Sequence, residues 1–139
     1  MSTEMREFSS LSDFIKFVDG ELAELRRSLG ELLRVLEDVR AKAEQDKKLR
    51  ELLSKLTGAS GAQPSPPVVD LRGLKVAINP SAEVELGLLE QLVEALNTKI
   101  TQLQAIRKEI EVLGGTDIEA SVKAIIIDGV PRALIIKVS

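Results

Sequence analysis

Leucine, isoleucine and valine recur along the first third of the chain in alternating steps of four and three residues. This spacing places them on one helix face, at the a and d positions of a coiled coil. The positions are Leu11, Ile15, Val18, Leu22, Leu25, Leu29, Leu32, Leu36, Val39 and Ala43. Because burying one leucine contributes about 1.5–3 kcal/mol, this stripe must be covered by another helix, from the same chain or from a second one.

A second stripe with the same spacing follows in the C-terminal half, interrupted only by Lys99. Its apolar positions are Leu89, Leu92, Leu96, Leu103, Ile106, Ile110 and Leu113. The two stripes predict two long helices that either pack on each other or build a helix bundle shared between chains, and both arrangements can hold together. We predict that the Leu, Ile and Val positions of both stripes form an oligomer interface, in a dimer or larger homo-oligomer or with another coiled-coil protein.

Local signals predict where the first helix begins and ends. Ser10 can cap its start, and Gly58 offers a left-handed stop after Thr57. Residues 58–67, with the sequence GASGAQPSPP, predict a linker that stiffens toward its prolines. We therefore divide the chain into a coiled-coil helix at 1–57, the linker at 58–67, and a second part at 68–139.

The second part begins with a predicted strand and continues into the second helix. Residues 68–78 alternate in polarity and predict one strand, with Arg72-Gly73 as a bulge or turn. Asn79 and Pro80 are expected to start the helix, which ends at Leu113 before two glycines.

The C-terminal segment predicts a β-hairpin. Residues 122–127 and 130–138 are rich in β-branched side chains and flank Asp128-Gly129, a favoured two-residue turn. A regular hairpin would place Ile125, Ile127 and Leu134 on one face and Ile126 and Ile135 on the other. Such a hairpin needs a helix or another strand to cover it. The chain as a whole predicts a helix-dominated α+β fold with a small antiparallel β element.

The strand at 68–78 and the C-terminal hairpin stand at opposite ends of the second helix. A helix of that length holds its ends roughly 50 Å apart. If the helices of two chains lie antiparallel, the strand of one chain would reach the hairpin of the other. This geometry predicts a sheet completed between subunits.

The composition excludes several classes of function. The chain has no Cys, His, Trp or Tyr, so the commonest general base and the commonest metal ligands are missing. No catalytic, metal or cofactor motif is present, and we expect no enzyme and no cofactor. We also expect a cytoplasmic protein without a membrane partner, since no long apolar run occurs. Many charges, no Cys and abundant Ile, Leu and Val resemble thermophile composition.

Charge argues against a nucleic-acid partner. The net charge is −3 at pH 7, with the two signs well mixed along the chain. One basic cluster occurs, but acidic residues dilute it and no aromatic residue lies nearby to stack on bases. Its members are Lys42, Lys47, Lys48, Arg50 and Lys55.

All three aromatic residues, Phe8, Phe14 and Phe17, stand at the start of the first helix. They predict either an internal packing plug or a surface that docks a partner.

No motif identifies a family, and three hypotheses for function follow. The first is a non-catalytic, homo-oligomeric coiled-coil scaffold or assembly protein. Long helices attached to small β elements are similar to the general architecture of prefoldin-type chaperones, although prefoldin places its hairpins between the two helices. That resemblance implies a second hypothesis, a chaperone-like holder of unfolded chains that uses exposed helix ends. The third is a nucleic-acid-associated architectural protein.

Overall fold

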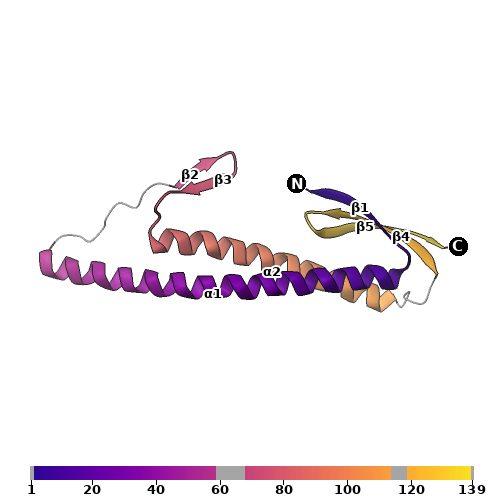
Figure 1. The fold of residues 1–139 in the computed structure, drawn as a ribbon, viewed down its shortest axis with the longest axis horizontal. Coiled ribbons are helices and arrows are strands. Elements are labelled where there is room, and N and C mark those ends of the chain that lie inside the picture. Colours follow the sequence, from indigo (N-terminus) through magenta and orange to yellow (C-terminus); the bar gives the residue numbers. More distant parts are fainter. Residues whose placement is uncertain (1, 59–67, 114–118, 139) are drawn as a thin grey trace. The chain divides into compact units, whose positions relative to one another are not determined.

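The computed structural model of the chain describes residues 2–58, 68–113 and 119–138, and of Leu113 only the backbone. It contains two long helices and two small antiparallel sheets, the helix-dominated α+β fold that the sequence predicts (Figure 1). In chain order the elements are β1 (Thr3–Phe8), α1 (Leu11–Thr57), β2 (Val68–Leu71), β3 (Leu74–Ala77), α2 (Ala82–Leu113), β4 (Ala120–Ile127) and β5 (Val130–Val138).

The chain forms two compact units. The first consists of Met1–Leu29 and Ala95–Ser139, and the second of Gly30–Glu94. The division runs across both helices, so that each unit holds one segment of α1 and one segment of α2. The first unit contains a sheet in the order β1-β4-β5, and the second contains the hairpin β2-β3.

The first helix begins and ends where the sequence predicts. The Ser10 hydroxyl accepts a hydrogen bond from the amide of Asp13 at 3.1 Å, which caps the first turn. Gly58 follows the last turn with a φ of 69°, and its amide donates to the carbonyl of Ser54 at 2.9 Å. These contacts satisfy backbone groups that a helix end otherwise leaves without a partner.

The predicted start of the second helix is wrong by two residues. Asn79 has a φ of 46° and lies outside the helix, and Pro80 also precedes it. The cap is Ser81, whose hydroxyl accepts from the amide of Val84 at 3.3 Å. A residue before proline is disfavoured in the helical conformation, and asparagine tolerates the left-handed one. The helix runs to Leu113 as predicted, whereas the two glycines expected to stop it lie outside the described residues.

The segment at 68–78 forms two strands rather than one. Arg72 and Gly73 have φ values of 52° and 91°, as the central residues of a type I′ turn do, and the Gly73 amide donates to Asp70 Oδ1 at 2.8 Å. β2 therefore pairs with β3, with Val69 opposite Val76. The single strand on which the shared-sheet prediction depended does not exist in the described chain.

The C-terminal hairpin is confirmed, and an additional strand, β1, which was not predicted from the sequence, pairs with β4 along the edge away from β5. Asp128 and Gly129 form the turn, with φ values of 52° and 80°. β1 pairs antiparallel with β4, from Thr3 opposite Ile127 to Phe8 opposite Val122. β4 is thus the central strand of a three-stranded sheet whose strands all come from one chain.

A β-bulge changes which residues of the hairpin share a face. Ile126 lies opposite Pro131, but Ile125 lies opposite Ala133, so that Arg132 is the extra residue. Leu134 consequently pairs with Ala124 and shares the face of Ile126, and the predicted grouping of Leu134 with Ile125 is wrong. Because the side-chain period of a strand is two, one extra residue exchanges the two faces of β5 beyond the bulge.

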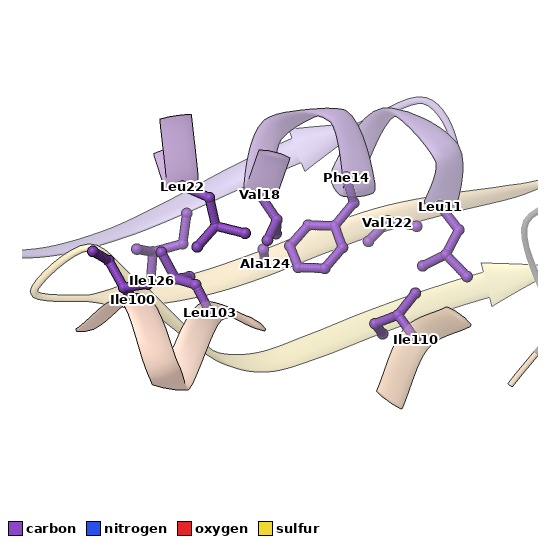
Figure 2. Packing of buried hydrophobic residues seen from close by; sticks show 10 residues of the cluster. All are labelled: Leu11, Phe14, Val18, Leu22, Ile100, Leu103, Ile110, Val122, Ala124 and Ile126. Atoms are coloured by element: carbon purple, nitrogen blue, oxygen red, sulfur yellow. The ribbon is translucent and has the colours of Figure 1, made fainter. Parts of the chain in front are cut away.

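The core of the first unit lies between one face of the sheet and the two helix segments. α1 contributes Leu11, Phe14, Val18 and Leu22, α2 contributes Ile100, Leu103 and Ile110, and β4 contributes Val122, Ala124 and Ile126. Figure 2 shows these side chains pointing toward one another from the three elements. The helical period of α1 and α2 and the two-residue period of β4 thus converge on a single apolar cluster.

Candidate functional site

The predicted interface residues of α1 are largely covered within the chain. Leu11, Val18 and Leu22 are buried in the core of the first unit, and Leu36 and Val39 are buried in the second. The remaining positions, Ile15, Leu25, Leu29 and Leu32, are half-buried. This is the intramolecular packing that one of the two sequence interpretations predicts, and a role in an oligomer remains a prediction.

The stripe of α2 is covered less completely. Leu103 and Ile110 are buried, while Leu92 is 50% exposed. The half-buried members are Leu89, Leu96, Lys99 and Ile106. The side chain of Leu113 lies outside the described residues. The α2 stripe therefore offers Leu92 to solvent even after the two helices have packed.

The three phenylalanines form one cluster inside the first unit. The rings of Phe8 and Phe14 meet edge to face with centroids 5.5 Å apart, and those of Phe8 and Phe17 are 5.4 Å apart. Phe14 has no exposed surface. The Arg6 guanidinium stands 4.8 Å above the Phe17 ring, a cation–π contact. The cluster performs the packing role that the sequence allowed, and docking of a partner on the half-buried Phe8 and Phe17 remains a prediction.

Ion pairs join the two helices in each unit. In the first unit Arg107 Nε donates to Asp19 Oδ1 at 2.5 Å, and Arg107 also lies 3.1 Å from Glu111. The pKa of Arg107 is raised, first because Asp19 accepts hydrogen bonds from the guanidinium and then because Glu111 does. In the second unit Arg50 of α1 pairs with Glu83 of α2. Arg50, one member of the basic cluster predicted on α1, thus already forms an ion pair within the chain.

The last turns of α1 carry an apolar stripe that the described chain does not cover. We call Leu49, Leu52, Leu53 and Leu56 the helix-end stripe. Their spacing of three, one and three residues puts all four on one helix face, and their exposed fractions lie between 53 and 74%. The sequence signals this segment by a change of phase after Ala43, but only the structure shows that it remains exposed.

The hairpin β2-β3 presents a second uncovered apolar surface. Val69 lies opposite Val76 and Leu71 opposite Leu74, so these four side chains share one face, which we call the hairpin face. Val69, Leu71 and Leu74 are 48–64% exposed. The opposite face carries Lys75, whose ammonium donates to Gln91 of α2 at 3.3 Å. The hairpin face was missed from sequence because it depends on the turn at Arg72 and Gly73.

Metal-binding clusters and buried polar side chains are absent from the described residues. Among them, no group of three or more acidic side chains is placed to hold a metal ion, and no polar or charged side chain is buried. In the same part of the chain, neither α1 nor α2 has the apolar length that a membrane crossing requires. The helix-end stripe and the hairpin face are the exposed surfaces from which a function can be proposed.

No family model, curated protein or solved structure matches the chain.

Proposed function

We propose that this protein is a non-catalytic, homo-oligomeric assembly protein whose copies associate through the hairpin face. The observation that carries the proposal is the exposure of Val69, Leu71 and Leu74 on one face of β2-β3. A two-stranded hairpin is at best marginally stable in water without a covering layer. A second copy supplies an identical face, so the two can cover each other around a two-fold axis.

The energetics support self-association through this surface. Fully burying one Val or Leu contributes roughly 1.5–3 kcal/mol, and each copy offers four such side chains that are not fully covered. No charged residue lies on the hairpin face, because Asp70 and Lys75 pair on the opposite one. Two hairpin faces can therefore meet without burying a charge, which would oppose association.

Two neighbouring positions of β2 give a matched test. Val69→Lys places a charge on the hairpin face, whereas Val68→Lys places the same charge on the opposite face, and both residues are exposed. We expect light scattering to show a multimeric wild type, an unchanged mass for Val68→Lys, and a reduced mass for Val69→Lys. A wild type that is monomeric at the highest soluble concentration would overturn the proposal, as would equal masses for the two variants.

A second candidate function is a holder of unfolded chains. The helix-end stripe favours it, because four leucines on one exposed helix face can bind apolar segments without a specific sequence. In the order of the chain, the hairpin β2-β3 also comes between the two long helices. Prefoldin-type chaperones place their hairpins at this position. The stripe would shield client side chains and delay their aggregation.

The test uses reduced insulin, whose aggregation is followed by light scattering. The double variant Leu53→Ser with Leu56→Ser should lose most of the protection that the wild type gives. Val112→Ser is the control, since Val112 is as exposed as Leu56 but lies on α2 outside the stripe. If the wild type gives no protection, or if the control loses as much as the double variant, the holder function is refuted.

A further inference from the structure

The strand β5 leaves one edge without a partner among the described strands. The sheet order is β1-β4-β5, so β4 is paired on both sides and β5 on one side only. β5 is nine residues long, Val130–Val138. The amide and carbonyl groups along a free edge are ready to pair with another strand, and natural proteins usually protect such edges.

The two edges of this sheet are protected very differently. β1 carries Glu4, Arg6 and Glu7 along its six residues, which is the charged composition that discourages strand addition. On β5, the five residues from Leu134 to Val138 include one charge, Lys137. Ile135 is 42% exposed, Ile136 47% and Val138 69%. The β1 edge thus carries charges that oppose the addition of a strand, whereas the β5 edge presents apolar side chains on both faces of the strand.

We infer that the free edge of β5 pairs antiparallel with the same edge of a second copy and joins two sheets of three strands into one of six. This inference rests on the proposed homo-oligomer, but it uses a different surface from the hairpin face. When two copies are related by a two-fold axis, a contact from one residue of the first β5 to another residue of the second β5 is repeated with the two copies exchanged. The strand must therefore be compatible with its own reversed sequence.

The positions of the charges on β5 select one register. With Ile135 opposite Ile135, Leu134 lies opposite Ile136, and Lys137 lies opposite Ala133. Leu134 and Ile136 both belong to the face that packs on the helices, because they pair with Ala124 and Val122. With Leu134 on the axis, Ile136 would lie opposite Arg132, and with Ile136 on the axis, Ile135 would lie opposite Lys137. Each of these registers sets an exposed isoleucine against a charged side chain instead of an apolar one.

This register covers the exposed apolar side chains. Ile136, which is 47% exposed, gains Leu134 of the second copy as a neighbour on the helix-facing side. Ile135 meets its own symmetry mate on the outer side. Directly opposite residues of antiparallel strands stand about 4.5–5.5 Å apart, close enough for these side chains to contact.

Charge reversal at the symmetry axis gives the sharpest test. Ile135→Lys and Ile135→Glu each put like charges face to face, so the β5 contact should be lost in either variant alone and the measured mass should fall. An equimolar mixture should restore it, because lysine then faces glutamate. Met5→Lys is the control: Met5 is also exposed, but it lies on β1 at the opposite edge of the sheet, and its substitution should leave the mass unchanged.

Disulfide formation tests the register independently of any loss of folding. The chain has no native cysteine. Ile135→Cys should link two copies under mild oxidation, since disulfides need Cα atoms within about 7 Å. Ala133→Cys should not link to itself, because four residue steps of about 3.3 Å separate the two copies of this position.

The outcomes distinguish this inference from the proposed function. If the wild type is multimeric but Ile135→Lys keeps the full mass and Ile135→Cys does not link, β5 pairing is refuted while the homo-oligomer stands. If Val69→Lys has no effect but the Ile135 variants lose and regain the contact as described, the edge inference holds and the hairpin-face proposal fails. A monomeric wild type overturns both.

Discussion

Ser2 and Asp128 exchange two hydrogen bonds across 126 positions of the sequence. The amide of Ser2 donates to Asp128 Oδ1 at 3.0 Å, and the amide of Asp128 donates to the carbonyl of Ser2 at 2.8 Å. Asp128 also opens the turn between β4 and β5 with a φ of 52°. One residue thus sets the hairpin turn and fixes the beginning of β1 beside it.

Replacement of Asp128 should therefore weaken the sheet at both places. Asp128→Ala removes the side-chain acceptor, worth about 0.5–1.5 kcal/mol, and forces alanine into a left-handed conformation, at roughly 1–2 kcal/mol more. Asp128→Gly is the control, because it removes the acceptor and tolerates the positive φ. Urea unfolding should rank the variants as wild type, then Asp128→Gly, then Asp128→Ala. Equal midpoints for wild type and Asp128→Ala would show that these contacts contribute nothing to stability.

Leu103 is the α2 side chain with no exposed surface in the apolar cluster of the first unit. Leu103→Ala leaves a cavity among the helices and β4, and it should lower the free energy of unfolding by about 2–5 kcal/mol. The same truncation at Leu92, which is 50% exposed, should change it by about 0.5 kcal/mol or less. Thermal unfolding measures both. Similar losses at the two positions would contradict the packing described for α2.

Periodicity and turn chemistry were sufficient to predict the helices and the C-terminal hairpin. The four-three spacing from Leu11 to Ala43 survives without a break, and Asp128-Gly129 has few other conformations available between two β-branched runs. β1 was missed for a physical reason. Its side chains from Thr3 to Glu7 are all exposed, so no buried alternation marks it, and it exists as a strand because β4 offers an edge.

The exposed surfaces were harder to predict than the elements that carry them. The sequence shows that Leu49, Leu52, Leu53 and Leu56 leave the phase of the first stripe, but not whether another segment covers them. The hairpin face depends on the chain reversing at Arg72 and Gly73, where a bulge within one strand was an equal alternative. The bulge at Arg132 decides on which face of the sheet the side chain of Ile135 lies. In each case a tertiary contact or one extra residue decides which side chains meet solvent.

The contact between Arg107 and Asp19 should stabilise the protein equally over a wide pH range. A raised pKa in the folded state gives a stabilisation that is complete below the unfolded pKa and is lost only as the pH rises through the folded one. Both values for arginine lie far above neutral pH. The difference in unfolding free energy between wild type and Arg107→Gln should therefore be the same at about pH 6 and about pH 9.

Salt provides the complementary measurement for this contact. The Arg107 side chain is partly exposed, and at about 1 M salt the screening length falls to roughly 3 Å. The difference between wild type and Arg107→Gln should shrink accordingly. A difference that persists at high salt would mean that the variant disturbs packing instead of charge.

Three exposed glycines inside the helices, Gly20 and Gly30 in α1 and Gly87 in α2, provide the last prediction. A Cβ built on each meets nothing within 4 Å. Glycine in a helix interior is about 0.5–1 kcal/mol less favourable than alanine, so each Gly→Ala change should raise the free energy of unfolding by about that amount. Gly73→Ala is the control, because its φ of 91° should make the same change destabilising.

Calorimetry at several protein concentrations decides between two explanations if a helix variant is destabilised. A loss that grows with concentration would show that a second chain approaches that glycine closely in the oligomer, whereas a loss independent of concentration would contradict the open surface described at that position.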